Sequence, residues 1–191
     1  MQNIPISLCL VVGLFILTPK NTQGQSVRIS YYGETFTHYG LKAAYEYPLL
    51  SKIKEQNQSR KMLLIAPSAA LYRHPHNHFG IIIAPELMYR RIGKRGALFE
   101  AGIAPAYFRY FLEGSTYQVA ANGELERVRY AGGNAFLPTV FAGIGRDMSI
   151  RHGLPFTWYT RLNISQQRPY NTSSLTRFSL EIGAIFPFKK Q

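Results

Sequence analysis

The chain has 191 residues, with 22 Lys and Arg against 10 Asp and Glu, a formal net charge of +12, and a single cysteine, Cys9. This length fits one domain, and one cysteine excludes both a disulfide framework and a zinc site built on cysteines. The basic surplus would suit nucleic acid, but an export signal at the N-terminus argues against such a partner.

The N-terminus opens with the apolar run IPISLCLVVGLFILTP, followed by KNTQGQ. Sixteen residues are too few for a transmembrane helix, which needs roughly twenty. The run matches the apolar core of a secretory signal peptide, with the small residues Thr22 and Gly24 at positions −3 and −1 of a cleavage site. The sequence therefore predicts a cleaved signal peptide at 1–24 and one domain at 25–191.

Beyond the signal, apolar residues alternate with a period of two, which is typical of strands. Seven segments follow this rule: 39–47, 63–71, 79–89, 97–107, 136–144, 156–164 and 178–188. None of the 38 positions on the repeating face is charged. Residues 26–32, SVRISYY, supply a short first strand and bring the count to eight, in keeping with the even strand numbers of bacterial barrels.

The second face of these strands is dominated by Gly and Ala, as in Gly40, Ala44, Ala66, Gly102 and Gly143. A soluble barrel would expose polar residues there, whereas the crowded interior of a narrow barrel requires small side chains. Aromatic residues also gather at both ends of the strands, as in the interfacial girdles of membrane barrels. The fold class predicted is all-β, an eight-stranded antiparallel transmembrane β-barrel of the outer membrane.

Four prolines interrupt the pattern, Pro67, Pro85, Pro105 and Pro138, each on the outward face. Proline removes a hydrogen bond from a β-ladder. Reflection across the intervening turns places the four at matched heights, which predicts a band of β-bulges.

Three stretches of the chain, THYGLKAAYEYPLL, RHPHNHFGIIIAPELMYRR and NAFLPTVFAGIGRDM, resemble the small outer-membrane β-barrel proteins found in Bacteroidota. The resemblance spans most of the region after the signal. It implies a fold and a location in the cell outer membrane, and it carries no catalytic motif.

The stretch LYRHPHNHFG, residues 71–80, contains His74, His76 and His78. Pro and Asn are ordinary turn residues, so the first interpretation is a tight external turn. Parity turns His74 and His78 inward near His38, and three imidazoles could hold Zn²⁺ or Cu²⁺. His74, His76 and His78 are therefore a candidate metal site.

Parity also places charged residues inside the barrel, in equal numbers of each sign. They are Lys42, Arg90, Arg161 and Arg177 against Glu46, Glu86, Glu100 and Glu181. Unpaired charges in a narrow interior would be costly. We therefore predict a salt-bridged belt that plugs the barrel and leaves no continuous pore.

Small inward residues in the outer half leave room for an apolar pocket bounded by Tyr72, Ile82, Phe108 and Phe141. This keeps a binding or transport barrel for a small hydrophobic ligand or lipid as an alternative. A lipid A-modifying hydrolase would need Ser, His and a carboxylate at one height, and the pattern offers no such set. No enzymatic activity and no cofactor is expected.

Twelve of the 22 Lys and Arg fall in or beside the predicted periplasmic turns and the C-terminal tail. They predict a cationic rim, including Arg90, Arg91, Lys94 and Arg95, that contacts anionic headgroups or an acidic partner. The sequence thus predicts a structural or interaction protein of the outer membrane. Its partners would be outer-membrane lipids or another envelope protein, and not nucleic acid.

Overall fold

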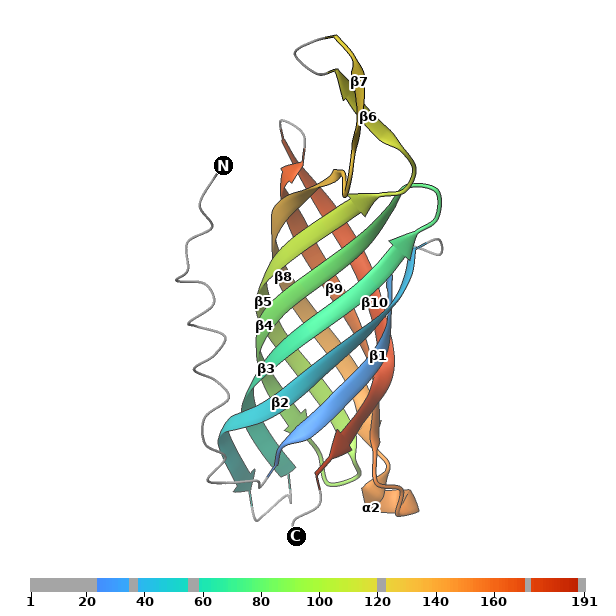
Figure 1. The fold of residues 1–191 in the computed structure, drawn as a ribbon. Helices are drawn as coiled ribbons and strands as arrows, with labels where there is room; N and C mark the ends of the chain where they lie inside the picture. The colour runs from blue at the N-terminus through green and yellow to red at the C-terminus, as the bar shows by residue number, and fades with distance from the viewer. Residues whose placement is uncertain (1–23, 35–37, 55–58, 120–122, 171–172, 189–191) are drawn as a thin grey trace.

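The structure is a computed structural model that describes residues 24–34, 38–54, 59–119, 123–170 and 173–188. Eight strands form a closed antiparallel barrel in the order β1-β10-β9-β8-β5-β4-β3-β2 (Figure 1). Their bounds are β1 Ser26–Glu34, β2 His38–Lys54, β3 Ser59–His74, β4 His78–Ile92, β5 Ala97–Leu112, β8 Gly132–Asp147, β9 Thr157–Tyr170 and β10 Ser173–Pro187. The fold class predicted from the sequence is confirmed.

The short first strand closes the barrel. β1 pairs with β2 from Ser26 opposite Glu46 to Glu34 opposite His38, and with β10 from Ser26 opposite Pro187 to Gly33 opposite Leu180. Closure leaves the sheet without a free edge, which would otherwise expose unpaired backbone groups.

Two further elements lie outside the barrel sheet. Strands β6 (Thr116–Val119) and β7 (Leu125–Val128) pair as a hairpin that projects beyond one end of the barrel, and the short helix α2 (Ser149–His152) lies at the other (Figure 1). We call these the hairpin end and the α2 end. None of the helices in the described residues is long and apolar enough to cross a membrane.

The barrel buries most of its charged strand residues among small and apolar side chains, and its outer wall is apolar. In β9, for example, Arg161 and Asn163 are buried, whereas Leu162 and Ile164 are exposed. Exposed aromatic side chains mark both ends of the wall. Tyr39, Tyr107, Phe136 and Phe178 lie toward the hairpin end, and Tyr45, Tyr89, Phe99, Trp158 and Phe186 toward the α2 end. This arrangement is the reverse of a water-soluble domain, in which the apolar face turns inward.

The prolines behave differently from expectation. Pro67 pairs directly with Pro85, and Pro105 with Pro138. Among the described strands, register shifts occur only between Pro48 and Leu50 and between Ser173 and Leu175. The predicted band of bulges is therefore wrong: proline removes a ladder hydrogen bond, but the register continues past it.

Two strands extend farther than the sequence indicated. The turn expected at 48–61 is shorter, because β2 continues to Lys54 and β3 begins at Ser59. Exposed Leu50 and Ile53 lie on this extension. The hairpin expected around Asn122-Gly123 forms as β6–β7, with Asn122 itself outside the described residues.

Candidate functional site

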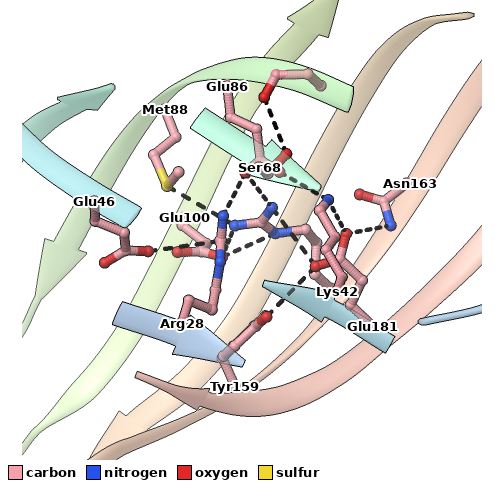
Figure 2. Close-up of polar contacts among 12 residues, drawn as sticks. Arg28, Lys42, Glu46, Ser68, Glu86, Met88, Glu100, Tyr159, Asn163 and Glu181 are labelled. Carbon is pink, nitrogen blue, oxygen red and sulfur yellow. Dashed lines mark hydrogen bonds and ion pairs between the residues drawn. The ribbon is translucent and has the colours of Figure 1, made fainter. Parts of the chain in front are cut away.

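Inside the barrel, toward the α2 end, eight charged side chains from six strands form an ion-paired belt. Figure 2 shows part of this belt in close-up. Its cations are Arg28, Lys42, Arg90 and Arg161, and its anions are Glu46, Glu86, Glu100 and Glu181. Four charges of each sign give the belt no net charge. We refer to these residues as the charge belt.

Arg161 and Arg90 each bind two carboxylates closely. Arg161 Nη2 lies 2.6 Å from Glu100 Oε1, and its Nη1 lies 2.8 Å from Glu86 Oε2. Arg90 donates to both oxygens of Glu46, at 2.6 and 2.7 Å, and to Glu100 at 2.9 Å. The planar guanidinium suits this forked geometry, because it presents several fixed donors.

Arg28 and Lys42 complete the belt. Arg28 donates to Glu86, and its Nη1 lies 3.6 Å from carboxylate oxygens of both Glu46 and Glu100. Lys42 Nζ lies 2.7 Å from both Glu86 and Glu181. Figure 2 shows Arg28, Glu46, Glu86 and Glu100 pointing toward one another from different walls of the barrel.

Arg28 is a belt residue that the sequence analysis missed. It lies between the outward residues Ile29 and Val27 on β1, and the same parity that placed Arg161 inside would have placed it. Arg28 is buried and lies beside three carboxylates of the belt, Glu46, Glu86 and Glu100.

Arg177, expected in the same set, belongs to a second cluster nearer the hairpin end. Its guanidinium binds Glu34 Oε2 at 2.6 Å and donates to Tyr72 Oη at 2.5 Å and to Gln167 at 3.0 Å. It also lies 4.6 Å from the ring centroid of Phe108. The interior is thus closed at two heights, by the charge belt and by this Arg177 cluster.

Between the two lies an interior space bordered by Ile82, Phe141, Ser68 and Asn163, with a volume of about 20 Å³. That is room for about one water molecule, whereas ligand clefts span roughly 300–1,000 Å³. Tyr72 and Phe108 do not border it, because their rings stack 6.0 Å apart in the Arg177 cluster. The apolar pocket expected from Tyr72, Ile82, Phe108 and Phe141 is closed by these side chains.

The histidine stretch forms the turn between β3 and β4, as expected from its Pro and Asn. The rings of His74 and His78 lie 5.3 Å apart, and His38 lies 3.7 Å from His74. His76 is exposed at the tip of the turn, with a φ of 63°. Within the part of the chain that the structure describes, no group of three or more His, Cys, Asp or Glu side chains is placed to hold a metal ion.

The hairpin end is tied together at its base. Arg73 Nε lies 2.6 Å from Glu113 Oε1, and the backbone amide of His76 donates to the same carboxylate at 3.2 Å. The Arg73 hydrogen bond holds the pKa of Glu113 below its usual value. Through these two contacts Glu113 anchors the β3–β4 turn.

At the α2 end, Arg91, Lys94 and Arg95 are exposed, in keeping with the expected cationic rim. Arg90 is not part of that rim, because its side chain turns into the charge belt. The acidic residue Asp147 lies near the same end. Its carboxylate accepts hydrogen bonds from the backbone amide and the hydroxyl of Ser149 at the start of α2.

No protein-family model matches the chain, and no curated protein matches its sequence. Among solved structures, the barrel superposes on Neisserial surface protein A with a TM-score of 0.50 and 10% identity, over 86% of this chain and 95% of that one. The fold is that of an eight-stranded outer-membrane β-barrel.

Two further solved structures superpose on the chain with TM-scores below 0.5. The N-terminal barrel domain of Pseudomonas aeruginosa OprF gives a TM-score of 0.48 at 15% identity, over 84% of this chain and 97% of that one. The outer membrane enzyme PagL gives 0.42 at 13% identity, over 86% and 100%.

Proposed function

We propose that the chain is an outer-membrane barrel whose plugged interior does not conduct and whose external hairpin presents a surface for interaction. The observation that carries this proposal is the charge belt: Arg161 and its carboxylate partners have side chains with 0% exposure inside a wall that is apolar outside. Eight strands enclose a lumen just wide enough for side chains to fill. The barrel then acts as a membrane anchor.

The β6–β7 hairpin is the part that this anchor would present. Tyr117, Val119 and Leu125 lie on one face of it and are more than half exposed, at 57%, 71% and 71%. Exposed apolar and aromatic side chains of this kind are typical of protein-binding surfaces. We expect an envelope or extracellular protein as the partner of this face.

Limited trypsin digestion of intact cells tests both the location and the orientation. Arg127 and Arg129 in the hairpin region and Arg91, Lys94 and Arg95 in the β4–β5 turn are exposed at opposite ends of the barrel. We expect cleavage after Arg127 or Arg129 in intact cells, and cleavage in the β4–β5 turn only after the outer membrane is permeabilised. An R127Q/R129Q variant is the matched control.

Recovery of the protein in the soluble fraction, or cleavage of the β4–β5 turn in intact cells, would contradict the proposal.

For the α2 end we propose that Arg91, Lys94 and Arg95 contact anionic headgroups of the inner leaflet or an acidic envelope protein. If charge reversal at all three left both membrane insertion and co-purifying proteins unchanged, this contact would be ruled out.

A further inference from the structure

An open groove lies in the outer wall of the barrel, where β5, β8, β9 and β10 adjoin. It has a volume of about 550 Å³, within the range of ligand clefts and far above that of the interior space. Its floor and sides are formed by Ile103, Pro105, Pro138, Val140 and Ile164, and its polar rim includes Gln166 and Thr176.

The groove follows from the proline pair. Pro105 and Pro138 face each other across β5 and β8, and neither has an amide hydrogen to donate. On the other side of β8, pairing with β9 is interrupted between Phe136–Arg168 and Thr139–Ser165. The wall is hollowed at this interruption, and the inward residues Ala104, Thr139 and Ser165 become part of the groove lining.

The groove ends in a polar, cationic edge toward the hairpin end. Arg168 is exposed, lies opposite Phe136 in the register, and donates to Gln166 of the groove rim. Two strands away, Arg109 donates to Asn134 Oδ1 at 3.1 Å, and Tyr107 donates to the same oxygen at 2.6 Å. Arg168 thus stands on the outer wall level with Phe136, and Arg109 stands beyond Tyr107 toward the hairpin end.

Arg109 and Arg168 differ from Arg73 in their charged neighbours among the residues that the structure describes. In the described ranges, neither Arg109 nor Arg168 forms an ion pair with a carboxylate, whereas Arg73 of β3, two strands from β5 in the other direction, is paired with Glu113. Guanidinium groups bind phosphate with forked hydrogen bonds. An apolar groove that leads up to two unpaired guanidiniums matches a molecule with an acyl chain and an anionic phosphate headgroup.

We propose that this groove is a binding site for one anionic, phosphate-bearing acyl lipid of the surrounding leaflet. An acyl chain lies along Val140 and Ile164, and the headgroup phosphate binds Arg168 and Arg109. The site rests on the proposed membrane location, and it differs from the cationic rim because it lies at the hairpin end and on the outside of the wall.

Lipid retention measured by native mass spectrometry tests the proposal. The full barrel is reconstituted in nanodiscs of equimolar phosphatidylglycerol and phosphatidylcholine, released, and its bound lipids are identified. We expect one phosphatidylglycerol per chain, retained roughly tenfold or more over phosphatidylcholine, because two arginines favour the net negative headgroup. An R109Q/R168Q variant should lose this preference.

Three further variants separate the parts of the site. V140F, which fills the groove, should lose the retained lipid, while I83F, a matched change on the exposed wall of β4, should retain it. R73Q removes an arginine of the same rim that is already paired, and should keep the preference. Equal retention of both lipids by the wild type, or an unchanged preference in R109Q/R168Q, would overturn the proposal.

Heat-modifiable gel migration of each variant distinguishes failure of the lipid site from failure of the barrel. If the variants migrate as folded barrels and still retain lipid as the wild type does, only the lipid site is wrong. If the wild type itself does not enter nanodiscs, the membrane location is wrong.

Discussion

Arg161 is held by three carboxylates and by an aromatic ring. Glu86, Glu100 and Glu181 surround its guanidinium, which also lies 4.0 Å from the centroid of the Phe141 ring. Removal of one partner of a buried ion pair strands the other charge, and typically costs about 3–5 kcal/mol. Exposed pairs such as Arg73–Glu113 contribute far less, because water screens both charges.

We therefore predict that Arg161→Ala lowers the free energy of unfolding by about 3–5 kcal/mol, because it leaves the buried carboxylates Glu86 and Glu100 short of one cation. Urea titration of the protein in lipid vesicles, followed by gel migration, measures the change. Arg73→Ala is the control and should shift the midpoint little. Equal midpoints for the two variants would show that the belt is not a buried ionic network.

A double change separates stranded charge from lost packing. Arg161→Met keeps much of the side-chain volume but still leaves Glu100 short of one cation, although Arg90 continues to bind it. Adding Glu100→Gln should recover part of the lost stability, because it removes the uncompensated carboxylate. If the double variant is less stable than Arg161→Met, packing rather than charge dominates at this position.

For individual residues, the alternation along each strand was enough to predict which side chains point into the barrel, but not which of them form ion pairs. Lys42, Glu46 and Glu86 were placed correctly from alternation alone. Arg28 contacts Glu86 although β1 and β4 are not neighbours, and such contacts across the lumen depend on the closure and stagger of the barrel. Arg177 separates from the belt because β10 carries it beside Glu34 of β1.

Among the strands, glycines make room for inward aromatic rings. Gly80 lies opposite Tyr72 in the register, and a Cβ on Gly80 would lie 2.4 Å from Tyr72 Cε1. Tyr72 in turn accepts from Arg177. The β3–β4 pairing and the Arg177 cluster therefore depend on the same ring.

We predict that Gly80→Val displaces the Tyr72 ring and releases Arg177, while leaving the charge belt in place. The thermal midpoint of heat-modifiable migration should fall, by more than for the conservative outward change Ile81→Val on the same strand. If Gly80→Val has the same thermal midpoint as the wild type, the position of the Tyr72 ring does not depend on the missing side chain at residue 80.

The hairpin is separate from the barrel sheet, and its base is closed by a hydrogen bond from Leu112 N to Ala131 O at 2.7 Å. We predict that replacing 116–128 with a short Gly-Ser linker leaves heat-modifiable migration unchanged. The same variant should lose any co-purifying external partner. Loss of the folded band would show that β6–β7 contributes to barrel assembly.

For the whole molecule, alternation and composition were sufficient to predict the architecture, because an apolar outward face and a small-residue inward face admit few other folds. The lengths of the strands were harder to predict from the sequence. β2 continues past Pro48 to Lys54, where the apolar pattern is weak, and the first residues of β3 pair with this extension. The outer groove was not foreseen, because it arises from prolines on two strands that pair without a bulge. The kinship with Bacteroidota barrels and the signal peptide at 1–24, which lies outside the described residues but for Gly24, stay predictions.

The most direct test of the account is single-channel recording of the purified wild-type protein in planar lipid bilayers. The charge belt and the Arg177 cluster close the interior at two heights, so we predict insertion without a steady conductance. Insertion is verified independently by heat-modifiable migration of the reconstituted protein. A steady, large single-channel conductance from the folded wild type would contradict the plugged barrel and favour a transport function.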